Sequence, residues 1–285
     1  MTFILNPLEV RTLQKHALYA LQVFHAFCEE HNLKYTLAYG TLIGSMRTGK
    51  MIPWDDDIDV VMSRSEYDRF VVLAKDHLNE VVFVQNYHTD PDFIHAFTRL
   101  TVEGSLAIQE DWAELDFHKG IFMDVFPLDK VAPENKRNHH MRLVNRYRRM
   151  KMGKLYAKNE TSVNPFVDSI KRFLLKPFSF QYLNRKLDEA AQTYNNDASL
   201  NLITSMMEGI KAYYPRFAID QSYLDDIVGI EFEGRIYPRP RRADEILTQY
   251  YGNYMEPPSI ELQEPHHGFV EFKFRDDIDD LLKNS

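Results

Sequence analysis

The 285-residue sequence has a single cysteine, Cys28, and no long apolar run. One cysteine excludes an internal disulfide and a cysteine-rich zinc site. No stretch approaches the roughly 20 apolar residues that a membrane-spanning helix needs. The first ten residues, MTFILNPLEV, lack the basic segment and the long apolar segment of a secretory signal. With no repeat and no low-complexity tract either, these absences favour a globular, cytoplasmic protein.

Charge is distributed unevenly along the chain. The net charge is −8, yet residues 136–186 hold fourteen Lys and Arg against two acids, so the rest carries −20. An acidic body with one basic band favours an anionic partner at the band. Two interpretations stay open: contact with anionic lipid at the inner face of the cell membrane, or a solvated basic face on an ordinary helix pair. Nucleic acid is not expected, because no base-reading motif is present.

The residue patterns predict an α+β fold. Hydrophobic residues make up 44% of the chain, enough for a buried core. Asn6, Pro7 and Glu9 form a helix-start signal, and apolar residues then recur at helical spacing until His31. The patterns indicate further helices over 42–47 and 63–77 and strands over 34–38, 58–62, 81–86, 95–102, 106–109 and 121–126, the last stopped by Pro127.

After residue 133 the patterns indicate mostly helix, over 134–158, 164–194, 197–213 and 244–251. We therefore expect a mixed sheet with flanking helices in residues 1–132. A mainly helical C-terminal region, residues 133–285, is expected to pack on it.

An acidic cluster is the most informative feature of the first half. Asp55, Asp56, Asp57 and Asp59 lie within five residues. Side chains two apart on a strand point to the same face, so Asp57 and Asp59 should project together. Two ionised carboxylates in a cleft need a counter-charge, and Mg²⁺ commonly joins one or two carboxylates to substrate phosphates. Asp124, which interrupts a later apolar strand, is the best third ligand.

Two glycine–hydroxyl pairs precede the cluster, Gly40-Thr41 and Gly44-Ser45. Glycine lets a backbone approach a phosphate, and amides and hydroxyls at a helix start can bind it. Arg47 and Lys50 add positive charge nearby. Taken singly, an aspartate run is often a solvated turn and a glycine–hydroxyl pair means little. The ordered set of strand, Gly-Thr turn, short helix, Asp-x-Asp strand and later strand acid is typical of a nucleotidyltransferase fold.

The stretch YGTLIGSMRTGKMIPWDDDIDVVM, residues 39–62, resembles the signature of the LicD family of phosphocholine transferases, which is distantly similar to the fukutin proteins. FMDVFPLD at 122–129 resembles the family's second motif, and YYGNYMEPP at 250–258 its third. The resemblance spans about residues 30–260. It implies a nucleotidyltransferase-like core and a metal-dependent reaction.

In that reaction phosphocholine passes from CDP-choline to a sugar hydroxyl of a surface glycan precursor, such as teichoic acid or lipopolysaccharide. Carried over by motif, Asp57, Asp59 and Asp124 are the catalytic metal carboxylates, with Mg²⁺ or Mn²⁺. Gly40, Thr41, Gly44 and Ser45 belong to the donor-phosphate turn. Asp55 is expected to orient the loop, and Asp56 to point opposite to Asp57.

Other residues are weaker candidates for the donor. Choline is a quaternary ammonium that binds aromatic faces, and Trp54, Tyr39, Trp112 and the tyrosines at 250, 251 and 254 are available. For any single one of these aromatic residues, however, core packing is the favoured explanation. Arg99 is either a donor-phosphate contact or an ion-pair partner of the acidic site. The histidines at 139–140 and 266–267 lack a spaced third ligand, so surface positions are expected, with 266–267 near the cleft.

Two other functions remain open at this point. The same fold could transfer a whole nucleotide or another phospho-substituent to a different acceptor, releasing pyrophosphate in the first case. A non-catalytic module that binds choline or glycan is the third reading. The Asp-x-Asp pair with Asp124 argues against that module, because a protein that only binds choline or glycan gains nothing from electrostatic repulsion among three carboxylates.

Overall fold

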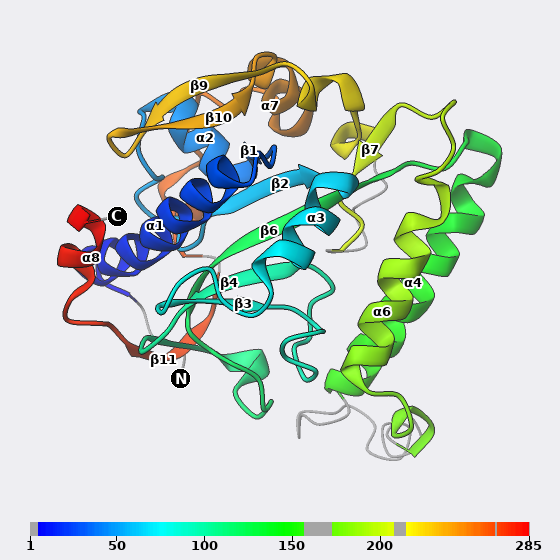
Figure 1. The fold of residues 1–285 in the computed structure, drawn as a ribbon, viewed down its shortest axis with the longest axis horizontal. Helices are drawn as coiled ribbons and strands as arrows, with labels where there is room; N and C mark the ends of the chain where they lie inside the picture. Colours follow the sequence, from blue (N-terminus) through cyan, green and yellow to red (C-terminus); the bar gives the residue numbers. More distant parts are fainter. Residues whose placement is uncertain (1–4, 157–172, 208–214, 266, 285) are drawn as a thin grey trace.

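The computed structural model describes residues 5–156, 173–207, 215–265 and 267–284. The first half begins with alternating helices and strands and ends with four strands (Figure 1). Its elements are α1 (Pro7–Glu30), β1 (Thr36–Leu37), α2 (Tyr39–Arg47), β2 (Asp59–Ser63), α3 (Arg64–Ala74), β3 (Val82–Gln85), β4 (Thr98–Val102), β5 (Leu106–Gln109) and β6 (Ile121–Lys130). The α+β prediction is confirmed.

The capping signals place the first helices as predicted. The Asn6 side chain accepts hydrogen bonds from the amides of Leu8 and Glu9, and Glu9 accepts from the Asn6 amide. This reciprocal capping box starts α1 at Pro7. The Ser63 side chain caps α3 by accepting a hydrogen bond from the amide of Glu66.

Strand β6 is longer than the sequence predicts. It continues through Pro127 to Lys130, so the expected stop at Pro127 is wrong. Two strands pair with the same edge of β6. β4 pairs with residues 121–125, and β7 pairs with residues 129–130. Pro127 lies between these two ladders, where its missing N–H costs no hydrogen bond.

The second half contains helices and short strands. Its elements are α4 (Glu134–Tyr156), α6 (Phe180–Ala191), β7 (Leu202–Thr204), β8 (Ile219–Asp220), β9 (Ile227–Phe232), β10 (Arg235–Pro240), α7 (Ala243–Tyr251), β11 (Phe269–Lys273) and α8 (Ile278–Asn284). The helix predicted over 197–213 is wrong over its described part, 197–207, which contains no helix and in which residues 202–204 form β7 beside β6. Residues 157–172 and 208–214 lie outside the described part. Among the described helices, none combines the length and apolar character that crossing a bilayer requires.

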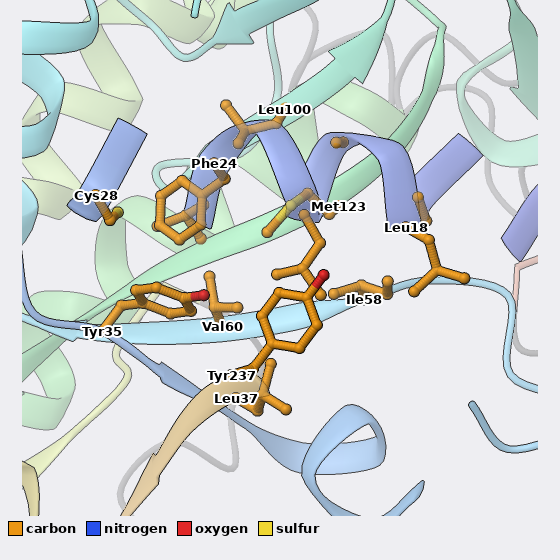
Figure 2. Close-up of a cluster of buried hydrophobic side chains, with 14 of the residues drawn as sticks. Leu18, Phe24, Cys28, Tyr35, Leu37, Ile58, Val60, Leu100, Met123 and Tyr237 are labelled. Carbon is orange, nitrogen blue, oxygen red and sulfur yellow. The ribbon is translucent and has the colours of Figure 1, made fainter. Parts of the chain in front are cut away.

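The main sheet is mixed and runs β1-β2-β6-β4-β3, with β7 and β8 continuing from β6. β2 and β6 are parallel, and their other neighbours are antiparallel. Alternate side chains of these strands enter two cores. Figure 2 shows the core under α1, a buried cluster that includes Phe24, Tyr35, Ile58, Val60, Leu100 and Met123.

The opposite face of the sheet carries Val61 and Phe126, which pack with Leu187 of α6 and with Ile246 and Tyr250 of α7. Because strand side chains alternate, Asp59, Arg99 and Asp124 belong to this second face. Figure 1 shows α4 and α6 as a pair at one edge of the molecule. The sheet therefore presents its polar residues on the side away from α1.

Candidate active site

Three neighbouring strands bring the predicted acids together. Asp59 of β2 stands in register with Asp124 of β6, and Arg99 of β4 stands in register with Asp124 from the other side. Asp57 lies two residues before β2. One carboxylate oxygen from each of Asp57, Asp59 and Asp124 lies within 4.8 Å of the others. The arrangement offers three convergent oxygen ligands, the set that a hard divalent cation prefers.

Arg99 is an ion-pair partner of this site. Its guanidinium donates two hydrogen bonds to Asp124, Nε to Oδ1 at 2.7 Å and Nη2 to Oδ2 at 2.9 Å. Both side chains are almost fully buried, with 5% and 4% exposed. The guanidinium also lies over the ring of Phe122, 3.4 Å from its centre. Of the two roles predicted for Arg99, the ion pair is the one present.

Burial and mutual repulsion raise the pKa values of two carboxyls in the acidic loop, residues 55–59. Burial, with the negative charges of Asp56 and Asp124, raises the pKa of Asp57 to about 6, although His267 and Arg99 oppose the shift. Burial and the charges of Asp57 and Asp56 raise the pKa of Asp55 well above its usual range. Both carboxyls bind protons more readily than ordinary aspartates, and a cation among them would favour their ionised forms.

Asp56 is held by a residue from the far end of the chain. Its fully buried carboxylate accepts hydrogen bonds from the backbone amide of His267 at 3.0 Å and from His267 Nδ1 at 2.9 Å. His267 Nε2 lies 3.9 Å from Asp57. Burial lowers the pKa of His267, but the Asp56 hydrogen bond and the charges of Asp57 and Asp56 raise it to about 9.

Two sequence-based expectations are corrected here. Asp56 does not point away from Asp57, since oxygens of Asp55, Asp56 and Asp57 also lie within 4.8 Å of one another. Residues 55–58 precede the strand, so strand alternation does not govern them. The histidines are not all at the surface: His267 is largely buried, and the buried His140 contacts the carbonyl of Ala190 at 2.7 Å. His266 lies outside the described residues.

The Gly-Thr turn supports the acidic loop directly. Tyr39 starts α2 with φ at 44°, a left-handed conformation at the turn from β1. A Cβ at Gly40 would lie 2.5 Å from Asp55 Oδ2, so glycine is required for the carboxylate to approach. Thr41 Oγ1 accepts a hydrogen bond of 2.9 Å from the amide of Asp59.

Gly44 and Ser45 have partners within the protein. A Cβ at Gly44 would lie 2.5 Å from the carbonyl oxygen of Lys50, and Ser45 donates to the carbonyl of Leu42 at 2.8 Å. Their part in phosphate binding stays a prediction.

A cavity of about 500 Å³ opens beside the acids. Asp55, Asp57 and Asp59 form one part of its lining, and aromatic and loop residues form the rest: Tyr39, Gly40, Ile43, Arg47, Ile52, Trp54, Tyr251, Asn253, Tyr254, Glu256 and Pro258. Arg47 donates hydrogen bonds to the carbonyls of Tyr254 and Glu256. Arg47 thus connects α2 to the segment after α7. Residues from 39–59 and from 251–258 line the same cavity.

The aromatic candidates separate into two groups. Trp54, Tyr39, Tyr251 and Tyr254 line the cavity, whereas Tyr250 is buried and stacks on Tyr39 with 6.3 Å between ring centres. Trp112 packs against His95 instead. The site therefore combines clustered carboxylates with aromatic walls.

Comparison with known proteins adds to this geometry. Residues 32–163 match the family described as LicD/FKTN/FKRP, nucleotidyltransferase domain. Over 274 residues the chain is 34% identical to the lipopolysaccharide cholinephosphotransferase LicD of Haemophilus influenzae, an alignment that covers 92% of this chain and 97% of that protein.

Proposed function

The chain belongs to the LicD/FKTN/FKRP family, and from this premise we propose that it transfers phosphocholine from CDP-choline to a sugar hydroxyl of a cell-surface glycan precursor. Membership confirms the resemblance carried by the motifs at 39–62 and 122–129. The name of the relative supports lipopolysaccharide as the kind of glycan, and teichoic acid is a second acceptor of the same chemistry.

The convergence of Asp57, Asp59 and Asp124 is the observation that carries the proposal. These carboxylates would hold Mg²⁺ or Mn²⁺, because their oxygens lie within 4.8 Å of one another and burial makes their shared charge costly without a cation. A bound cation would neutralise charge on the donor phosphates and on the leaving CMP. Arg99 would keep Asp124 in place for this role through its two hydrogen bonds.

The cavity suits the donor. Trp54, Tyr39 and Tyr251 line the cavity together with carboxylates, and aromatic rings near carboxylates attract a quaternary ammonium. Gly40 lines the same cavity, where the backbone of the Gly-Thr turn could approach a phosphate. Arg47 would act through the loop it holds, since its hydrogen bonds go to backbone carbonyls.

The acceptor hydroxyl must lose a proton as it attacks the phosphorus in line. We assign Asp55 as the group that takes this proton. Its carboxyl lines the cavity beside Asp57 and is not among the three proposed ligands, so it would be free to accept the proton of a hydroxyl bound there.

A product assay tests the proposal. Purified chain is incubated with Mg²⁺, CDP-choline and a lipopolysaccharide lacking phosphocholine, and the products are identified by mass spectrometry. CMP release with addition of one phosphocholine to the glycan is the expected result. In a parallel incubation with CTP in place of CDP-choline, pyrophosphate release with nucleotide attached to the acceptor would instead establish the nucleotidyltransferase alternative.

A further inference from the structure

The outward face of α4 is strongly basic. Arg142, Arg146 and Arg149 are exposed and follow one another at spacings of four and three residues, so they lie on one side of the helix. Within the described residues none of the three makes an ion pair, and the one acid of α4 is Glu134. The opposite side packs inward, with Val144 buried and Arg148 bonded to the carbonyl of Met206.

Apolar side chains continue this face at its C-terminal end. Phe173 and Leu174 are 78% and 62% exposed. The next residue, Leu175, lies against α4, because its Cδ1 would be 3.2 Å from a Cβ built at Gly153. Gly153 follows Arg149 by four residues and so belongs to the same side of the helix. We call Arg142, Arg146, Arg149, Phe173 and Leu174 the α4 surface.

The α4 surface sits where a planar partner can reach it. Figure 1 shows α4 and α6 side by side at one edge of the molecule, with α1 and the β9–β10 hairpin away from them. Outside residues 136–186 the chain has a net charge of −20. An anionic plane would therefore attract this edge and repel the remainder, which fixes the orientation of the molecule.

We propose that the α4 surface docks on a lipid bilayer that contains anionic headgroups. Cationic side chains bind such a surface electrostatically, and adjacent exposed apolar side chains enter the interface between headgroups and acyl chains. A soluble polyanion would use the arginines but leave Phe173 and Leu174 in water, so the bilayer is the partner that engages both. The proposal goes beyond the proposed function and does not depend on it.

Vesicle co-sedimentation of the full chain tests the electrostatic part. Vesicles of phosphatidylglycerol and phosphatidylethanolamine should bind the protein at low salt, and vesicles of phosphatidylcholine should not. Each Arg near an anionic surface contributes on the order of fivefold to binding. The triple variant R142E/R146E/R149E should therefore lose on the order of a hundredfold in affinity.

The matched control is K34E/K75E/K273E, which changes three exposed lysines elsewhere and reaches the same net charge. It should keep most of the binding. Equal losses in the two triple variants would overturn the proposal, because only total charge would then matter.

A second pair of variants tests the apolar part at constant charge. F173S/L174S should weaken vesicle binding several-fold, whereas V72S/L73S, also at exposed apolar positions, should not. Unchanged melting temperatures show that the variants are folded. Binding of F173S/L174S equal to wild type, or binding to heparin without binding to anionic vesicles, would contradict docking on a bilayer.

Discussion

Arg99 supplies the positive charge that allows Asp124 to stay buried on β6. The pair is bidentate and almost free of solvent. Removing one partner of a buried pair typically costs about 3–5 kcal/mol, because the other charge is left uncompensated. Arg99→Met should therefore lower the free energy of unfolding by about that amount, as measured by urea denaturation without metal.

Divalent cation should partly reverse that loss. Added Mg²⁺ is expected to raise the melting temperature of Arg99→Met more than that of wild type, since the cation replaces the missing charge beside Asp124. Arg185→Met is the matched control, because Arg185 pairs with Glu189 at an exposed position, where such pairs contribute at most about 1 kcal/mol. An Arg99→Met protein as stable as wild type without metal would contradict the role of the pair.

Gly40 and Gly44 should respond differently to the same substitution. In Gly40→Ala the new Cβ meets the side chain of Asp55, which can move, so turnover should fall at least about tenfold with a small change in stability. In Gly44→Ala the Cβ meets the backbone carbonyl of Lys50, which cannot move freely, so stability should fall by about 1–3 kcal/mol. Steady-state kinetics and urea denaturation of both variants distinguish these effects. Wild-type turnover in Gly40→Ala would show that the Asp55 position is unimportant.

The segment that leads into β11 packs against the acidic loop, although His267 and Asp56 are 211 residues apart in the sequence. His267 binds Asp56 through both its amide and its ring. The pKa of His267 is raised to about 9 in the folded protein, against 6.5 for an ordinary histidine. Its protonated form thus stabilises the fold fully below pH 6.5, and this contribution is lost as pH rises through 9.

Wild type should therefore lose more stability than His267→Gln between pH 6 and 9. The difference is at most about 3 kcal/mol, and smaller to the extent that the 23% exposed side chain is screened by solvent. Urea denaturation of both proteins in EDTA at several pH values measures it. Parallel stability curves would mean that the pair does not couple to folding.

Elements with local signals were predictable from sequence, and those fixed by distant contacts were not. Asn6, Ser63 and Gly252 mark ends of α1, α3 and α7 because capping is a property of neighbouring residues. Strand β7 was missed because it exists by pairing with Asp129 and Lys130 of β6. The motifs predicted that Asp59 and Asp124 lie close together. No sequence pattern near His267 predicted its contact with Asp56.

The two halves of the molecule share one core. Phe232, Tyr237 and Leu247 belong to the same buried cluster as Ile58, Val60 and Met123. Figure 2 shows Tyr237 of β10 beside Ile58 and Val60. We therefore expect one cooperative thermal transition by calorimetry, since neither half buries its apolar surface alone. Two separate transitions would instead support residues 1–132 and 133–285 as independently folding domains.

Titration calorimetry of CDP-choline, with and without Mg²⁺, on wild type and Asp57→Asn tests most directly whether the acidic cluster is the donor site. The Asp111→Asn variant, altered at an exposed acid, serves as control. We predict that wild type and the control bind CDP-choline in a Mg²⁺-dependent way, more tightly than CDP-ethanolamine or CTP, and that Asp57→Asn does not. Equal binding of CDP-choline by Asp57→Asn, or binding without metal and without choline preference, would contradict the proposed site.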